Sequence, residues 1–121
     1  MTAACRRILV VEDEMMIAIM IEDMLTDLGH QVVAVCQSLA AALAMTEAED
    51  APFDMAILDV NLAGERSFPV ARRLAERGVP FMFATGYGTL GLEEPFRSAL
   101  TLKKPFQQED LARAIAEVCP A

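Results

Sequence analysis

Residues 8–13 read Ile-Leu-Val-Val-Glu-Asp, four apolar residues followed at once by two acids. An apolar run this short, with no alternating polar residue, is typical of a central parallel strand that is buried on both faces. The next stretch, residues 14–28, carries apolar residues at helical spacing and stops at Gly29, which suits the left-handed position after a helix. Together the two stretches predict a strand followed by a helix, the repeating unit of an α/β sheet.

The same alternation continues along the rest of the chain. We expect strands at residues 8–11, 32–36, 55–58, 79–84 and 100–103. We expect helices at residues 14–28, 39–48, 69–77, within 89–99, and at 108–118. Ser38 is a candidate N-cap of the second helix, whereas Gly91 and Pro95 predict that the fourth is short or irregular. The predicted fold is α/β, (βα)5: a doubly wound, five-stranded parallel sheet with helices on both faces.

The bulk composition narrows the class of protein. A length of 121 residues fits one compact domain, so we expect residues 1–121 to form a single domain without an attached output domain. The 18 acidic residues outnumber the 10 basic ones, and the net charge of −8 argues against nucleic acid as a partner. No apolar run approaches the roughly 18 residues of a membrane span, and no signal peptide is evident. We therefore expect a cytoplasmic protein without a membrane partner.

The cysteines and the single histidine exclude several chemistries. Three widely spaced cysteines without a Cys-x-x-Cys pair predict reduced, mostly packed thiols. One histidine, His30, argues against a histidine metal site or a Ser-His-Asp triad. We expect His30 to be exposed in the turn after Gly29.

Polar side chains follow four of the predicted strands at the point where each strand ends. They are Glu12 and Asp13 after the first strand, Asp59 after the third, Thr85 after the fourth and Lys104 after the fifth. In an open α/β sheet ligands bind beyond the carboxyl ends of the strands. Three carboxylates gathered there would repel one another unless a cation joined them, and oxygen ligands with retained water suit Mg²⁺. The sequence therefore predicts a magnesium site at this edge.

The same residues suit phosphoryl transfer. Asp59 can act as the acceptor, although a carboxylate is a weak nucleophile, so the work lies in positioning and in stabilising charge. The Lys104 ammonium can neutralise one phosphoryl oxygen and the Thr85 hydroxyl can donate to another. We predict that Asp59, Thr85 and Lys104 carry the chemistry.

Four motifs resemble those of the receiver domain of two-component response regulators, in the CheY-like superfamily. They are ILVVEDE at 8–14, AILDVNL at 56–62, FATGYG at 83–88 and LKKPF at 102–106. The resemblance implies a flavodoxin-like sheet of strand order 2-1-3-4-5 and a signalling domain rather than an enzyme. Such a domain accepts its phosphoryl group from a histidine kinase or a histidine phosphotransfer protein and assists both its own phosphorylation and its dephosphorylation.

The resemblance also implies roles for individual residues. Mg²⁺ would be held by Glu12, Asp13, Asp59 and the backbone carbonyl of Asn61, and the Lys104–Pro105 peptide bond would be cis. Glu12 stands where most members have aspartate, and we expect a glutamate at this position still to bind the metal. Residues 80–88 are similar to the "FATGUY" receivers, mostly single-domain regulators of alphaproteobacteria, some of which act in the general stress response.

The usual switch aromatic of the fifth strand is absent, because Thr101 stands there. We therefore expect the loop with Gly86 and Tyr87 to read phosphorylation. Tyr87 would replace the missing aromatic or shield the acyl phosphate from water. The alternative is that Tyr87 has no switching role.

Met15, Met16 and Ile19 form a candidate partner surface on the first helix. Its core face is already supplied by other apolar residues: Ile17, Ile21, Met24, Leu25 and Leu28. Exposed methionines make adaptable contacts, so we expect the kinase or phosphotransfer protein to dock here. Incidental surface or dimer packing is the alternative.

Several functions remain open at this point. The chain could signal through phospho-dependent contacts with an unknown downstream protein, as a monomer or weak dimer, or act as a phosphate shuttle or sink in a phosphorelay. A haloacid-dehalogenase-type phosphatase would need a second acid where Asn61 stands. A degenerate receiver would normally have lost pocket residues, and a flavodoxin-like cofactor site would lack its phosphate loop.

Overall fold

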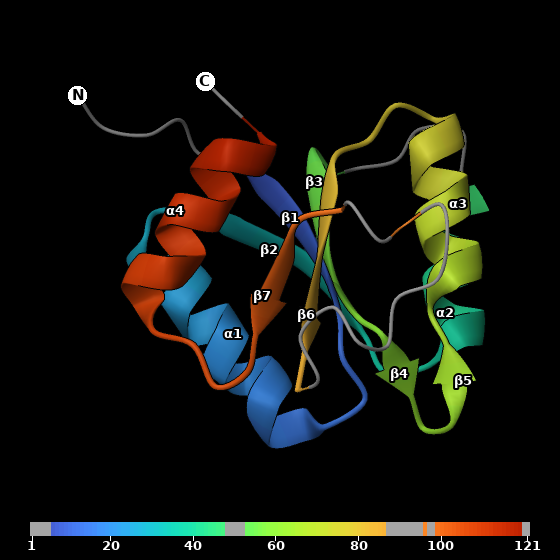
Figure 1. The fold of residues 1–121 in the computed structure, drawn as a ribbon, viewed down its shortest axis with the longest axis horizontal. Helices are drawn as coiled ribbons and strands as arrows, with labels where there is room; N and C mark the ends of the chain where they lie inside the picture. Colours follow the sequence, from blue (N-terminus) through green and yellow to red (C-terminus); the bar gives the residue numbers. More distant parts are fainter. Residues whose placement is uncertain (1–5, 48–52, 87–95, 97–98, 120–121) are drawn as a thin grey trace.

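The computed structural model describes residues 6–47, 53–86, 96 and 99–119. The strands of the main sheet, in spatial order, are β2 (Gln31–Cys36), β1 (Arg7–Val11), β3 (Met55–Asp59), β6 (Phe81–Thr85) and β7 (Thr101–Lys103). The helices are α1 (Met15–Asp27), α2 (Leu39–Glu47), α3 (Phe68–Glu76) and α4 (Gln108–Val118). All neighbouring strands of this sheet run parallel. Figure 1 shows α1 and α4 on one face of the sheet and α2 and α3 on the other.

The predicted α/β sheet is confirmed, since its order in chain sequence is 2-1-3-4-5 once a short hairpin is set aside. The fourth strand begins two residues later than predicted, because Pro80 has no N–H and contributes only its carbonyl, which accepts from the Ala56 N–H. The expected helix within 89–99 lies outside the described residues except for Phe96 and Ala99.

Both faces of the sheet bury apolar side chains, which explains the unbroken apolar runs. Along β1, Leu9 and Val11 pack into the core on the side of α2 and α3. Ile8 and Val10 pack into the opposite core with side chains of α1 and α4. All four are at most 1% exposed. Each side chain of this size stabilises the fold by roughly 1.5–3 kcal/mol on burial, so these cores hold the carboxyl ends of the strands in place.

Helix ends follow the expected local chemistry. Gly29 adopts φ +89° directly after Leu28, the C-cap residue of α1, as predicted. The Ser38 hydroxyl accepts a hydrogen bond from the Ala41 N–H at 3.1 Å at the start of α2. The positive φ of Gly29 helps to set where α1 ends, and the Ser38 cap helps to set where α2 begins.

The prediction that His30 is exposed was wrong, because only 8% of this residue is accessible. Its backbone N–H donates to the Leu25 carbonyl, and its ring Nδ1 accepts the Arg6 backbone N–H at 3.0 Å. Burial, aided by the nearby Arg6 charge, lowers the pKa of His30. The hydrogen bond from Arg6 therefore holds the His30 ring beside the start of β1.

A two-stranded antiparallel hairpin, which the sequence analysis did not predict, follows β3. It consists of β4 (Asn61–Leu62) and β5 (Glu65–Arg66), and its turn has positive φ at Ala63 (53°) and Gly64 (93°). Figure 1 shows this hairpin at the end of the sheet where β3 finishes. It therefore borders the edge at which the polar residues gather.

Two further features of the described residues bear on the protein's class. Cys36 is buried, Cys119 is partly buried, and both thiols are free. Among the helices described, none has the length and apolar character needed to cross a bilayer.

Candidate functional site

The carboxyl ends of β1, β3, β6 and β7 meet around an open cleft of about 780 Å³. The predicted site residues that line it are Asp13, Asp59, Asn61, Thr85, Gly86 and Lys104. Because the strands are parallel and in register, residues that lie far apart in the chain reach one edge together. The cleft is also lined by Arg66, which the sequence analysis missed.

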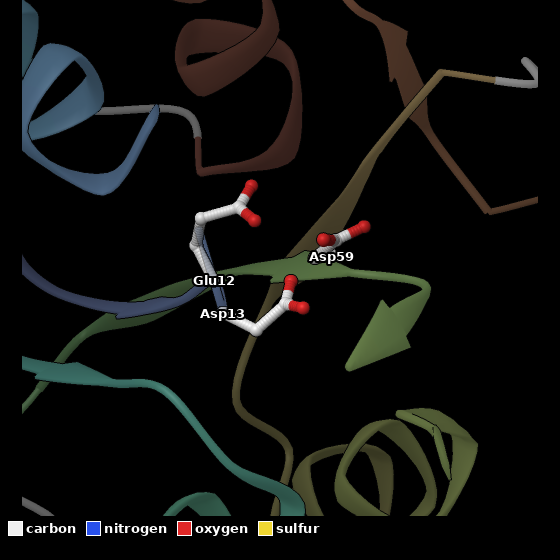
Figure 2. Close-up of side chains that lie close together, drawn as sticks. All are labelled: Glu12, Asp13 and Asp59. Atoms are coloured by element: carbon white, nitrogen blue, oxygen red, sulfur yellow. The ribbon is translucent and has the colours of Figure 1, made fainter. Parts of the chain in front are cut away.

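Three carboxylates converge at the base of the cleft, with Asp13 and Asp59 in its lining and Glu12 beneath it. One oxygen each from Glu12, Asp13 and Asp59 lies within 4.8 Å of the others, and Figure 2 shows the three side chains drawn together from the ends of two strands. Glu12 is 1% exposed and sits deepest. The Asp13 carboxylate accepts the Ala63 N–H from the hairpin turn at 3.0 Å. The acidic floor is thus tied to both β1 and the hairpin.

Lys104 supplies a cation at the floor. Its Nζ donates to Glu12 Oε1 at 2.5 Å and lies 3.4 Å from Asp59 Oδ2. The Lys104 backbone N–H donates to the Thr85 carbonyl at 2.8 Å, which joins the ends of β6 and β7. The Lys104–Pro105 peptide bond is cis. Lys104 therefore stands between a buried acid and the proposed acceptor.

The pKa of Asp59 is raised from 3.8 to about 7. Burial is the largest cause, and a hydrogen bond and charge repulsion from Glu12 add to it, whereas the Lys104 charge and the Asn61 N–H act in the opposite direction. The site thus holds more negative groups than its own cation can balance.

The donor set fits Mg²⁺. An octahedral Mg²⁺ with ligands at about 2.1 Å separates its donor oxygens by roughly 3–4.2 Å, and the three carboxylate oxygens already lie within 4.8 Å of one another. All are hard oxygen donors, and the open cleft admits the water molecules that Mg²⁺ retains. Small side-chain adjustments would bring the oxygens to one ion.

We predict that stability without divalent cations depends on Asp59. Its folded pKa lies above the unfolded value, so the native state binds the extra proton and its stability falls as the pH rises from about 4 to about 7. The difference between the folded and unfolded pKa of Asp59 corresponds to a change of at most about 4 kcal/mol in the free energy of unfolding. Water that enters the cleft makes the change smaller. Asp59→Asn should therefore raise the free energy of unfolding by roughly 1–2 kcal/mol at pH 8 and hardly at pH 4, as urea denaturation in EDTA would measure. Mg²⁺ should narrow the gap at pH 8, and an equal gap at both pH values would contradict the prediction.

The remaining predicted residues that the structure describes do not line the cleft. Thr101 is half-buried on β7, and its hydroxyl donates to the Ala99 carbonyl at 3.1 Å. Tyr87 lies outside the described residues. On α1, Met15 is 55%, Met16 84% and Ile19 49% exposed, and Met20, which the sequence analysis did not single out, is 39% exposed.

Comparisons with known proteins agree with this geometry. The response regulator receiver domain family matches residues 8–116. The solution structure of SdrG from Sphingomonas melonis Fr1 is 45% identical, covers 96% of this chain and 98% of its own, and superposes with a TM-score of 0.84.

Two further structures extend the comparison. The BeF3-activated conformation of SdrG from Pseudomonas melonis Fr1 is 46% identical over 91% of this chain and 92% of its own, with a TM-score of 0.77. A PhyR stress response regulator is 28% identical over 95% of this chain but only 45% of its own, with a TM-score of 0.79. No curated protein sequence matches the chain significantly.

Proposed function

The chain belongs to the response regulator receiver family, and from that premise we propose that it accepts a phosphoryl group on Asp59. The observation that carries the proposal is the convergence of three carboxylates in an open cleft, with Lys104 Nζ 3.4 Å from Asp59. An Asp59 carboxylate beside a fixed cation is positioned both to attack a phosphorus atom and to have the resulting charge balanced.

In the proposed transfer, an Asp59 carboxylate oxygen attacks the phosphorus of a phosphohistidine on the donor protein. The P–N bond breaks, its electron pair stays on the imidazole nitrogen, and that nitrogen takes up a proton. Asp59 is left as an acyl phosphate, which attack by water returns to carboxylate and inorganic phosphate. The domain thereby assists both its phosphorylation and its dephosphorylation.

Glu12, Asp13, Asp59 and the Asn61 backbone carbonyl would hold Mg²⁺, which supplies charge stabilisation to the phosphoryl oxygens when bound. Lys104, whose Nζ lies 3.4 Å from Asp59 Oδ2, would balance the negative charge of a further phosphoryl oxygen. The Thr85 hydroxyl, at the end of β6 and in the lining of the cleft, would donate to another.

The partner that donates the phosphoryl group is proposed to be a histidine kinase or a histidine phosphotransfer protein. The exposed Met15, Met16 and Ile19 on α1 offer it an adaptable apolar contact. This contact would lie next to the cleft, because Glu14, just before α1, and Ile17, in its first turn, both line the cleft. A downstream protein would read the phosphorylated form, unless the domain serves as a shuttle or sink. The FATGYG motif and the likeness to a PhyR stress response regulator support a stress-response pathway.

The test is stoichiometry. The protein is incubated with acetyl phosphate and Mg²⁺ and its intact mass is followed. We expect up to one phosphoryl group per chain, none in EDTA, and no sustained turnover of small phosphoesters. Absence of the adduct with Mg²⁺ would refute the proposal, and continued phosphoester hydrolysis would favour a phosphatase.

A further inference from the structure

Arg66 is a second cation in the cleft lining, together with Asp59, Thr85 and Lys104. It is exposed, on β5, and in residues 6–47, 53–86, 96 and 99–119 its guanidinium makes no ion pair. Because Arg66 is exposed, its guanidinium is solvated where no acid binds it, and its place in the cleft lining is what distinguishes it from other surface arginines. Its guanidinium is therefore available to an anion bound in the cleft.

The hairpin fixes the base of the Arg66 side chain. Arg66 lies directly opposite Asn61 in the antiparallel pair, and Asn61 follows Asp59 by two residues. The turn is held by the Gly64 N–H, which donates to Asn61 Oδ1 at 2.9 Å, and by the contact of Ala63 with Asp13. Next to Arg66, the N–H of buried Ser67 donates to the Val60 carbonyl at 2.9 Å. The hairpin therefore holds Arg66 at a position where it lines the cleft.

The phosphorylated site would carry more negative than positive charge, and Arg66 could balance the difference. Lys104 is already shared between Glu12 and Asp59. Once Asp59 carries a phosphoryl group of about two negative charges, that group, Glu12 and Asp13 are balanced by Lys104 and one divalent cation alone. One negative charge remains in surplus beside the cleft that Arg66 also lines. A guanidinium is well suited to it, since it can donate to two phosphoryl oxygens at once.

We propose that Arg66 is a phosphoryl-binding residue, a third donor to the aspartyl phosphate beside Thr85 and Lys104. This inference rests on the proposed function. Arg66 would stabilise the phosphoryl group on Asp59 by hydrogen bonds, and it would not be a ligand of Mg²⁺.

The experiment measures beryllofluoride binding to the full chain in Mg²⁺ by NMR titration. We compare the wild type with Arg66→Gln, Arg66→Lys and the control Arg72→Gln, which removes the same charge from an exposed α3 position outside the cleft lining. Arg66→Gln should weaken beryllofluoride binding about 3–10-fold, as expected for a partly solvated charge-assisted hydrogen bond. Arg66→Lys should recover part of the loss, and Arg72→Gln should match the wild type.

A second titration, with Mg²⁺ alone, separates phosphoryl binding from damage to the hairpin. Because the hairpin turn contacts Asp13, a distorted hairpin should weaken Mg²⁺ binding, whereas loss of a phosphoryl contact should not. The inference is overturned if Arg66→Gln binds beryllofluoride like the wild type, if Arg72→Gln loses as much, or if Mg²⁺ affinity falls in parallel. Failure of the wild type to bind beryllofluoride would instead refute the proposed function.

Discussion

Asp59→Asn should reduce phosphoryl acceptance to the background of the assay. The amide nitrogen and oxygen of asparagine are poor nucleophiles, and no other described carboxylate that lines the cleft is so close to Lys104. Glu12, which is closer, is 1% exposed and hydrogen-bonded to that lysine. Intact mass after incubation with acetyl phosphate and Mg²⁺ measures the result directly.

Asp54→Asn is a matched control, because it makes the same chemical change beside the same strand but at its opposite end. Asp54 accepts from the Arg7 backbone at 2.8 Å and from its guanidinium at 3.1 Å, and these contacts lower the pKa of Asp54. This variant should lose some stability and still accept one phosphoryl group. A phosphorylated Asp59→Asn protein, or a folded Asp54→Asn protein that cannot be phosphorylated, would show that the acceptor lies elsewhere.

The edge at which the site forms could be predicted from sequence because parallel strands place their carboxyl ends together. A polar residue that directly follows an apolar run must then appear at that edge, and Asp13, Asp59, Thr85 and Lys104 all line one cleft there. The depth of each residue was not predictable in this way. Glu12 follows the same strand as Asp13, yet it turns beneath the cleft to meet Lys104.

Arg66 escaped the sequence analysis for a physical reason. Strands of two residues are too short to show a hydrophobic period. The hairpin turn is also held by Asp13, which lies 50 positions earlier in the chain, so the local sequence does not contain its anchor. The burial of His30 was missed for a similar reason, since the Arg6 N–H that its ring accepts lies 24 positions earlier in the chain.

Phe83→Ala should lower the free energy of unfolding by about 3–5 kcal/mol, the largest stability loss that we predict. Phe83 is fully buried on β6. Its ring makes edge-to-face contacts with three other rings, at centroid distances of 5.9 Å to Phe68, 5.6 Å to Phe81 and 6.0 Å to Phe96. Truncation removes all three contacts and leaves a cavity beneath the sheet, because backbone on both sides of β6 prevents collapse. Chemical denaturation measures the loss.

Phe81→Ala is the control for this cavity, since Phe81 is only partly buried and begins the same strand. Its loss should be roughly 1–2 kcal/mol, because water already reaches part of that ring. Phe83 lies two residues before Thr85 but does not line the cleft. Below its unfolding transition, Phe83→Ala should therefore still accept one phosphoryl group on Asp59. Equal losses in the two variants would mean that burial of Phe83 does not hold β6 in place. An unphosphorylated but folded Phe83→Ala protein would mean that the ring positions Thr85 as well as stabilising the core.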